Sequence, residues 1–288
     1  MSTAAEITTE VPTIFIRPTR GWVSLKLREM WEYRELLYFL IWREVKLRYK
    51  QTVFGAGWAI LQPLMTMLVF TVFFGRLAGV GSDGVPYPIF SYAGLLPWIF
   101  FADGVNKASG SLLSLSTLLT KVYFPRLIIP LSSVLSGVLD FAIAFLVLIG
   151  MMVYYGVWPS WGVLYLPFLL LLALGSALGV GIWLAPLNVW YRDIRYVVPF
   201  FVQLWLFVTP VIYPASKASA KLAELGLPAW LLGLNPMAGV VEGFRWALLG
   251  TGSRPGPIIL ASVAVTLLLL VSGTLYFRRL EKTLADVV

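Results

Sequence analysis

The sequence predicts an all-α integral membrane protein, and three observations carry this prediction. Hydrophobic residues make up 59% of the 288 positions, whereas charged residues make up only 12%, about half the share of a soluble globular protein. The mean hydropathy is +0.84. Charge-free apolar runs recur along the chain, long enough for the roughly 20 residues that a helix needs to cross a membrane. These features exclude a soluble domain and a disordered chain.

Two segments precede the first apolar run. Residues 1–21 lack the basic start and the apolar stretch of a cleavable signal peptide, so we expect a disordered tail there. Residues 22–50 place charges and apolar residues at helical spacing, with recurrent Trp and Tyr, which predicts an amphipathic helix at the membrane interface. The pattern leaves open whether this helix is a lipid anchor alone or also docks a cytoplasmic partner.

Six transmembrane helices are predicted within residues 57–277, as parts of one membrane domain that covers residues 22–288. The charge-free run 141–191 is too long for one helix, and Pro159 and Gly162 divide it. Only Asp140 places a charge inside a predicted span. The spans are expected at residues 57–74, from 84–102 onward, 127–155, 164–186, 196–213 and 258–277.

Residues 228–250 are apolar but unsuited to a seventh span. They contain Glu242 and Arg245, each of which costs about 2.5–3.5 kcal/mol at mid-membrane, and the pair Asn235-Pro236 interrupts them. We therefore expect a re-entrant or interfacial hairpin at the outer face, between spans five and six.

Lys and Arg are distributed unequally between the two sides of this topology. Seventeen lie on the side that holds both termini, and five lie on the other side. The positive-inside rule then places both termini in the cytoplasm. This asymmetry and attraction to anionic lipid account for the net charge of +8, so we expect no nucleic-acid partner.

The residue inventory limits the chemistry that the chain can perform. Cys and His are both absent, which excludes Cys/His zinc sites, haem ligation and a Ser–His–Asp triad, and we expect no metal site. The phosphate-binding pattern G-x-x-x-x-G-K-[ST] is also absent. If the protein moves cargo with ATP, another subunit must bind the nucleotide.

A few residues in or beside the spans are candidates for special roles. Asp140 lies inside span three and could serve in a proton relay, or could be protonated or hydrogen bonded to a serine one or two turns away. Arg192 and Asp193 could form an ion pair that fixes the loop after span four. The small residues within 175–181 predict close helix packing.

Aromatic residues make up 15% of the chain, and many flank the spans as interface belts. Others lie within spans one and five. Packing or lipid contact is the plainer interpretation for any one ring, but a ladder of rings would let a sugar chain slide through a channel. The candidates for such a channel wall are Phe70, Phe73, Phe74, Phe200, Phe201, Trp205 and Phe207.

Four motifs follow one another along the chain. They are QTVFGAGWAILQP at 51–63, Asn188 with Arg192-Asp193-Ile194, Thr209-Pro210-Val211-Ile212-Tyr213, and Asn235-Pro236 with Glu242-Gly243-Phe244-Arg245. In this order they resemble the type-2 ABC exporter permeases that export polysaccharide. The resemblance covers roughly residue 22 to the last residue and points to O-antigen, capsule and teichoic-acid exporters.

This resemblance implies a homodimeric permease that pairs with two ATPase subunits. The ATPases would bind ATP and Mg, so this chain would need no cofactor. The cargo would be a lipid-linked polysaccharide, moved from the cytoplasm across the bacterial inner membrane.

The resemblance also implies roles for particular residues. Asn235, Pro236, Glu242 and Arg245 would belong to an outer gate. The residues that would couple the membrane domain to the ATPase are Leu118, Lys121, Val122, Tyr123 and Phe124 in a coupling helix, and Arg28 and Arg34 in the interface helix.

Two other classes of protein remain as alternatives. An ion-coupled secondary transporter needs several buried ionisable residues, whereas Asp140 alone lies within a predicted span. A membrane enzyme acting on lipid-linked glycans needs charged groups gathered at one face. The acidic residues Asp83, Glu224 and Glu242 are widely separated in the sequence.

Overall fold

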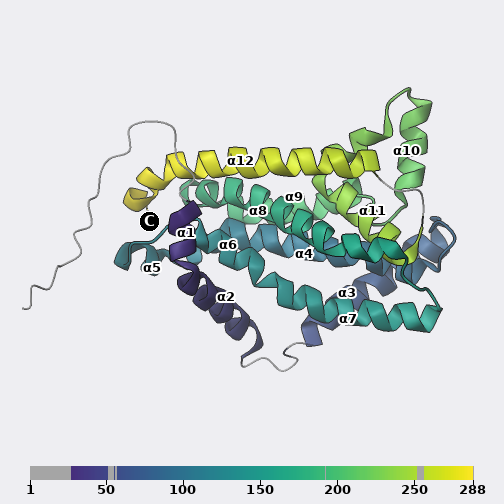
Figure 1. Cartoon of the computed structure of the whole chain (residues 1–288), viewed down its shortest axis with the longest axis horizontal. Coiled ribbons are helices and arrows are strands. Elements are labelled where there is room, and N and C mark those ends of the chain that lie inside the picture. Colours follow the sequence, from purple (N-terminus) through teal and green to yellow (C-terminus); the bar gives the residue numbers. More distant parts are fainter. Residues whose placement is uncertain (1–26, 51–54, 56, 192, 252–255, 288) are drawn as a thin grey trace, which may run out of the picture.

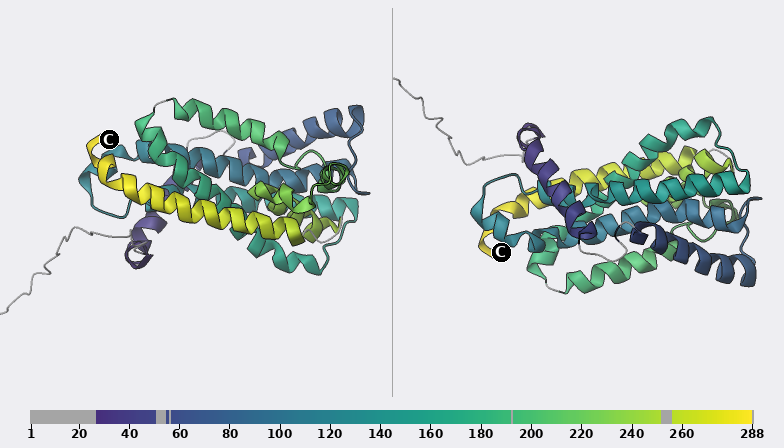
Figure 2. Two further views of the ribbon diagram at one scale, coloured as in Figure 1. Left: turned by 90° about the horizontal axis from the view of Figure 1, so that it is seen from above. Right: turned by 90° about the horizontal axis from the view of Figure 1, so that it is seen from below.

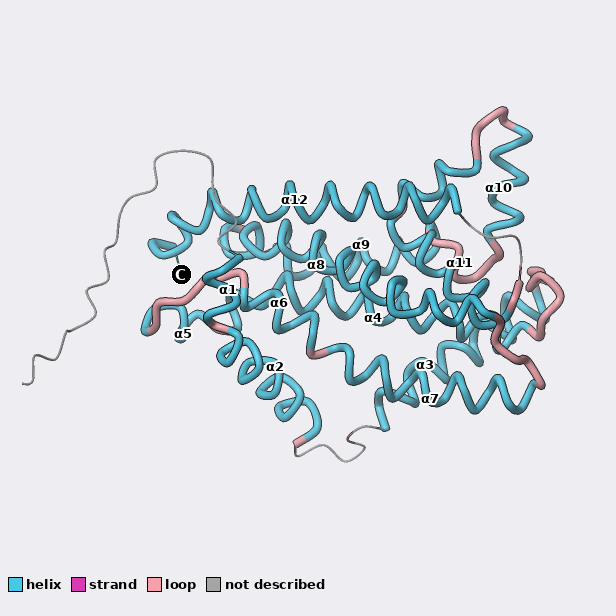
Figure 3. The backbone as a smooth tube through the Cα atoms, in the orientation of Figure 1, coloured by secondary structure: helices cyan, strands magenta, loops and turns pink. Residues whose placement is uncertain are grey.

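The chain forms a bundle of long helices. The computed structural model describes residues 27–50, 55, 57–191, 193–251 and 256–287, and every regular element in these ranges is a helix (Figure 1, Figure 3). The predicted all-α class is therefore confirmed for this part of the chain. Within the described ranges, five helical stretches are long and apolar enough to cross a membrane: Gly57–Leu77, Tyr87–Ser114, Ile128–Tyr155, Trp161–Trp190 and Gly256–Glu281.

The expected fifth span is shorter than predicted. Helix α9 (Ile194–Val208) has 15 residues, a length of about 22 Å against roughly 30 Å of hydrocarbon. The helix stops before Pro210, which lacks a backbone N–H and clashes with the preceding turn. Helix α9 nevertheless leads from the end of α8 toward the opposite end of the bundle, as a sixth span would (Figure 1). The six-span topology therefore remains a prediction.

Helix α4 (Tyr87–Ser114) is the centre of the bundle. In its most apolar stretch 78% of the residues are buried, and it contacts α3, α6, α7, α8, α9 and α11. The basic residues within 103–126 predict a cytoplasmic loop after the second span, but this prediction is wrong in its start, because α4 continues past Asp103 and Lys107. The hydroxyls of Ser109, Ser111 and Ser114 donate to carbonyl oxygens three residues earlier, at 2.7–2.8 Å, so these polar residues fit inside the helix.

Helix α8 (Leu166–Trp190) packs closely against α4 and α12 (Gly256–Val287) through small residues. A Cβ added to Gly181 would stand 2.5 Å from the Cβ of Ala108 in α4. On another face, a Cβ at Gly179 would stand 2.9 Å from the Cβ of Leu269 in α12. The interpretation of 175–181 as a packing face is confirmed.

The expected third span is two helices that meet at Ser136, namely α6 (Ile128–Leu135) and α7 (Gly137–Tyr155). Before α8 lies a short 3₁₀ helix, η2 (Trp161–Tyr165). The first span is α3 (Gly57–Phe70), which continues as a π-helix, η1 (Thr71–Leu77), where the Ala78 N–H donates to the Phe73 carbonyl five residues earlier at 2.9 Å.

The N-terminal helical segment is bent rather than a single rod. It consists of α1 (Leu27–Glu32) and α2 (Arg34–Tyr49), and α2 crosses the bundle obliquely and packs on α6 (Figure 2). At 100° per residue, the charged residues of α2 are spread around its axis instead of gathering on one face. The prediction of two segregated faces is therefore wrong for α2, although its exposed aromatic residues Tyr38, Phe39 and Trp42 remain compatible with an interface. Residues 1–26 lie outside the described ranges.

The two ends of the bundle differ. The α5 end holds α1, α5 (Ser116–Lys121) and the last turns of α12, and the α10 end holds α10 (Ala215–Glu224) (Figure 1). The segment between α9 and α12 contains α10, the 3₁₀ helix η3 (Ala229–Leu234) and α11 (Pro236–Leu249). Helix α11 is almost wholly buried and contacts α4, α8 and α12.

We predict that Gly179→Val destabilises the bundle, because the new side chain collides with Leu269 in α12. Overpacking of this kind costs about 1–3 kcal/mol. The measurement is the midpoint of thermal unfolding in detergent, followed by tryptophan fluorescence. Gly150→Val in α7 is the matched control, since a Cβ there meets no atom within 4 Å. Equal midpoints for the two variants would contradict close packing of α8 on α12.

Candidate functional site

Two polar clusters lie at different levels of this apolar bundle. The first, named here the Arg245 cluster, comprises Arg245, Glu242, Asn235, Thr209 and Tyr87 near the α10 end. The second, named here the Asp140 cluster, comprises Asp140, Arg48, Tyr49 and Lys107 and lies nearer the α5 end.

The guanidinium of Arg245 is completely buried and binds backbone carbonyls from two other segments. Its Nη1 donates to the Pro210 carbonyl at 2.6 Å and its Nη2 donates to the Val211 carbonyl at 2.5 Å. The Nε donates to the Phe90 carbonyl of α4 at 3.2 Å. One side chain of α11 therefore holds together α4 and the turn that follows α9.

Two neighbouring residues make room for this guanidinium. A Cβ at Gly94 would stand 2.5 Å from Nη2 of Arg245, so only glycine leaves space there. The guanidinium carbon lies 3.6 Å from the centre of the Phe90 ring, a cation–π contact that is strongest when desolvated. Gly94 and Phe90 are both in α4, one helical turn apart.

Asn235 ties the start of α11 to the end of α9. Its Oδ1 accepts from the N–H of Met237 at 3.1 Å, which caps α11, and from the indole N–H of Trp205 at 3.1 Å. Its Nδ2 donates to the hydroxyl of Thr209 at 2.9 Å. In the same region the buried hydroxyl of Tyr87 donates to the Ile212 carbonyl at 2.8 Å.

All four residues predicted for an outer gate thus lie near this junction. Asn235 and Pro236 start α11, and Glu242 and Arg245 are buried within it. Glu242 and Arg245, one helical turn apart, form an ion pair, but at 3.8 Å it is longer than the hydrogen bonds from Arg245 to the carbonyls of Phe90, Pro210 and Val211. The carbonyl oxygens of Pro210 and Val211 therefore lie closer to the guanidinium than the Glu242 carboxylate does.

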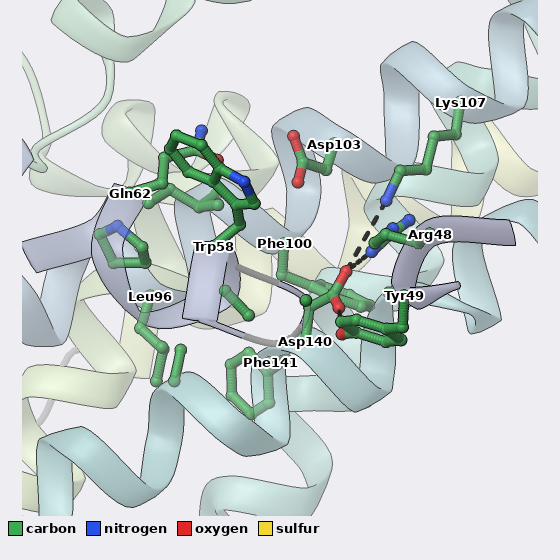
Figure 4. A pocket seen from close by; sticks show the side chains of 16 residues that line it. Arg48, Tyr49, Trp58, Gln62, Leu96, Phe100, Asp103, Lys107, Asp140 and Phe141 are labelled. Atoms are coloured by element: carbon green, nitrogen blue, oxygen red, sulfur yellow. Dashed lines mark hydrogen bonds and ion pairs between the residues drawn. The ribbon is translucent and has the colours of Figure 1, made fainter. Parts of the chain in front are cut away.

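The Asp140 cluster joins three helices that are distant in sequence (Figure 4). Asp140 at the start of α7 forms an ion pair with Arg48 and accepts a hydrogen bond from the hydroxyl of Tyr49, both from the end of α2. The ammonium of Lys107 in α4 lies 3.9 Å from the same carboxylate. Burial raises the pKa of Tyr49, which keeps its phenol protonated as a donor.

These contacts correct the sequence-based expectations for Asp140. The expected serine partners do not bind it, because Ser132 and Ser133 donate to the Ile129 carbonyl and Ser136 donates to the Ser133 carbonyl. The basic partners come from α2 and α4 instead. An ion-paired carboxylate at this position argues for a structural role over a proton relay.

The Asp140 cluster borders a cavity of about 220 Å³ between α2, α3, α4 and α7. Its other walls include Trp58 and Gln62 of α3, Asp103 of α4 and Phe141 of α7 (Figure 4). The cavity therefore combines two cations, two carboxylates and aromatic rings.

The residues predicted to couple to an ATPase lie at the α5 end. Helix α5 ends at Lys121, so Val122, Tyr123 and Phe124 of the predicted coupling helix lie in the loop that follows it. Tyr123 is 83% exposed and Val122 and Lys121 are also exposed, whereas Phe124 is buried and Leu118 is half-buried. The loop is tied down by Arg126, whose Nη1 donates to the Glu281 carbonyl of α12 at 2.7 Å.

Of the two basic residues predicted for coupling in the interface helix, one is described. The Arg34 guanidinium lies 5.8 Å from the centre of the Trp31 ring. The side chain of Arg28 lies outside the described part of the structure. The predicted Arg192–Asp193 pair likewise depends on Arg192, which is outside the described residues, while Asp193 precedes α9.

The seven aromatic candidates separate into two groups. Phe70 is buried and Phe74 is half-buried, with their rings in edge-to-face contact at 5.5 Å, and Trp205 contacts Phe101 in the same way at 5.1 Å. These three rings serve packing within the chain. The rings that remain exposed on the surface of the single chain are Phe73, Phe200, Phe201 and Phe207.

Several residues that belong to the two clusters or contact them were not identified from the sequence. Phe90 and Gly94 do not stand out in the sequence, because both belong to the charge-free apolar run at 84–102. Arg48 and Tyr49 lie 91 or more residues from Asp140, so no local spacing connects them.

The described part of the bundle has five helical stretches long and apolar enough to cross a membrane, which is the architecture of a multi-pass membrane protein. A family model described as "ABC-2 type transporter" matches residues 35–249, which is well over half of the chain. The chain therefore belongs to the ABC-2 type transporter family.

Individual relatives refine this assignment. The chain is 34% identical over 259 residues to an O-antigen export system permease protein RfbA from Myxococcus xanthus, which covers 88% of this chain and 96% of that protein. It is 27% identical over 274 residues to a protein of the same name from Klebsiella pneumoniae, covering 92% and 100%. A 73-residue stretch, 25% of this chain and 28% of its relative, is 29% identical to the polysialic acid transport protein KpsM of Escherichia coli.

We predict that Arg245→Lys destabilises the protein, because one ammonium cannot reach the carbonyls of Phe90, Pro210 and Val211 together. Loss of a hydrogen bond to a buried charged group costs about 1.5–3 kcal/mol. The measurement is the thermal unfolding midpoint in detergent, with the exposed Arg195→Lys as control. An unchanged midpoint for Arg245→Lys would show that a point charge is sufficient at this position.

Proposed function

We propose that this chain is the membrane-spanning permease subunit of an ATP-driven exporter that moves polysaccharide. The observation that carries the proposal is the continuous likeness, over 88% of this chain, to a protein named as an O-antigen export permease. The apolar helical bundle supports it, because such a domain can form a passage through lipid. The finer proposal is that the cargo is a lipid-linked polysaccharide taken from the cytoplasm.

A second copy of the chain would complete the passage. In the single chain only 17% of the most apolar stretch of α3 is buried, against 78% for α4. The rings of Phe200, Phe201 and Phe207 on α9 are exposed as well. Two copies that meet through α3 and α9 would cover part of this apolar surface and set the exposed rings along the passage, where a ring face can bind the C–H face of a sugar.

Two ATPase subunits would bind at the α5 end. At this end α5 lies near α1 and the last turns of α12 (Figure 1), and the exposed Tyr123 follows α5 in the chain. ATP and Mg would be held by the ATPases alone. Closure of the ATPases would move α5 and α2, and the rigid bundle would carry the movement to the two permease copies as shifts of whole bodies.

The α10 end would face outward in a bacterial inner membrane. Helices α10 and α11 would then form the re-entrant hairpin and gate, and the Arg245 cluster would set the position of that gate relative to α4 and α9. A sixth span formed by α9 would place both termini in the cytoplasm, in agreement with the excess of Lys and Arg at the α5 end.

The coupling proposal predicts a specific effect of Tyr123→Ala. In membranes that contain the permease with its ATPase, we expect polysaccharide export to fall several-fold while insertion and basal ATP hydrolysis persist. The physical reason is the loss of an exposed ring from the surface that would contact the ATPase. Tyr154→Ala is the matched control, because Tyr154 is also 83% exposed but lies near the other end of the bundle. Unaltered export by Tyr123→Ala would remove Tyr123 from the coupling surface.

Orientation is tested by labelling single cysteines, which the cysteine-free chain permits. A cysteine at Ser82, between η1 and α4, is expected to react in intact cells with an impermeant maleimide added outside. A cysteine at Ser114, the last residue of α4, is expected to react only after the membrane is opened. The reverse pattern of labelling would overturn the proposed orientation.

A further inference from the structure

Helix α12 is hydrogen bonded near both of its ends to segments that lie at opposite ends of the bundle. Its 32 residues form one continuous helix with no proline after the first turn, and they extend over about 48 Å. Its main contacts with other helices are with α8, α11 and η3. The loop that follows α5 reaches α12 through side chains at the last turns of the helix.

The joint at the α5 end is formed by Arg126 and Glu281. The backbone N–H of Arg126 donates to Oε1 of Glu281 at 3.3 Å, and Nη1 of Arg126 donates to the Glu281 carbonyl at 2.7 Å. Oε2 of Glu281 lies 3.7 Å from Nη1 of Arg278, whose side chain is buried. Because both the backbone and the side chain of Arg126 are held, the loop cannot turn about a single contact.

This joint lies close to the surface proposed for the ATPase. Arg126 follows the exposed Tyr123 by three residues, a stretch of chain that spans at most about 10 Å. Phe124, which lies between them, is buried. A displacement of Tyr123 would therefore reach Arg126 through a short segment that is partly fixed in the core.

The joint near the other end of α12 is the hydroxyl of Ser262, which is completely buried. Ser262 lies 19 residues before Glu281, about 28 Å away along the helix. Its hydroxyl accepts from the N–H of Gly239 in α11 at 3.2 Å and donates to the Gly233 carbonyl of η3 at 3.3 Å. A Cβ on Gly239 would stand 2.5 Å from this oxygen, so glycine allows α11 to lie directly against α12.

The position of α12 makes it easier to move than the centre of the bundle. Helix α4 also connects α5 with α11, but 78% of its most apolar stretch is buried, against 22% for α12. Helix α12 lies along the edge of the bundle (Figure 1). Fewer neighbours must rearrange when such a helix slides along its axis, which is the usual way in which packed helices shift.

We propose that α12 transmits movement of the loop after α5 to the start of α11, with Arg126, Glu281 and Ser262 as positioning residues. The inference rests on the proposed function, in which an ATPase moves the α5 end and α11 belongs to an outer gate. It adds a direct connection within each chain to the shift of whole bodies. When the loop moves, Glu281 would draw α12 along, and Ser262 would carry the shift to η3 and α11.

The first measurement is amide hydrogen exchange in the purified full-length chain, which needs neither ATPase nor cargo. Glu281→Ala removes the acceptor of the Arg126 N–H and the ionic partner of Arg278. We expect several-fold faster exchange at 126–129 and, because α12 links the two joints, also at 237–239 in α11. Arg279→Ala is the matched control, since Arg279 is an exposed residue of the same helical turn and should leave both regions unchanged.

The second measurement is the amount of polysaccharide exported per ATP hydrolysed, in membranes that contain the permease with its ATPase. Glu281→Ala should lower this ratio several-fold while the amount of bound ATPase stays constant. Glu281→Gln keeps an oxygen that can accept from Arg126, so it should restore most of the ratio. Ser262→Ala breaks the joint near the other end and should lower the ratio in the same way, which keeps the test informative if Glu281→Ala does not fold.

Unchanged exchange at 237–239 in Glu281→Ala would overturn transmission through α12. An unchanged ratio of export to hydrolysis in either Glu281→Ala or Ser262→Ala would overturn the role of these joints in export. The two measurements also separate this inference from the proposed function. If the unmodified chain exports no polysaccharide but exchange at 237–239 rises in Glu281→Ala, the transport proposal fails and the connection through α12 stands.

Discussion

The buried guanidinium of Arg245 is the interaction on which the α10 end of the molecule depends. A helix interrupted by Pro210 leaves carbonyl groups without helical partners in a setting that offers little water. Arg245 satisfies the carbonyls of Pro210 and Val211, and it reaches the Phe90 carbonyl at the same time. The irregular turn after α9 is stable in an apolar bundle because this charge replaces the missing backbone donors. The cost of burying the charge is offset by several short hydrogen bonds and by the ring of Phe90.

In the Asp140 cluster the polar partners are side chains, whereas Arg245 binds backbone carbonyls. Asp140 lies in the first turn of α7, shortly after the break at Ser136 that separates α6 from α7. Its carboxylate faces Arg48, Tyr49 and Lys107, so the end of the separate helix α2 is fixed to the bundle by charge as well as by packing. Both clusters therefore stand where a helix is interrupted, which is where an apolar chain most needs polar partners.

Composition was sufficient to predict the class of fold, because apolar runs bounded by charges leave few alternatives to membrane-crossing helices. It also predicted which small residues pack, as Gly179 and Gly181 show. The prediction was less reliable where a residue could serve two purposes. Asp103 and Lys107 looked like the start of a loop, yet they belong to α4 because a polar cavity receives their side chains.

The partners of Asp140 and Arg245 could not be predicted from spacing. Arg48 is far from Asp140 in sequence, and the partners of Arg245 are carbonyl oxygens, which every residue carries. The family resemblance placed Asn235, Glu242 and Arg245 in one motif without saying that the motif closes on Thr209 and Phe90. Contacts of this kind join segments that are distant in the sequence, so no periodic pattern of residues predicts them.

The π-helix at the end of α3 has a consequence for how length changes are absorbed. Removing one residue from an ordinary helix turns everything beyond it by about 100°. In the stretch Thr71–Leu77 the hydrogen bonds already span one residue more than in an α-helix. Deletion of one residue there would return the stretch to the winding of an α-helix. The chain can therefore be shortened by one residue near Gly75, against which the Tyr87 ring lies, without changing the path of α3 before this point.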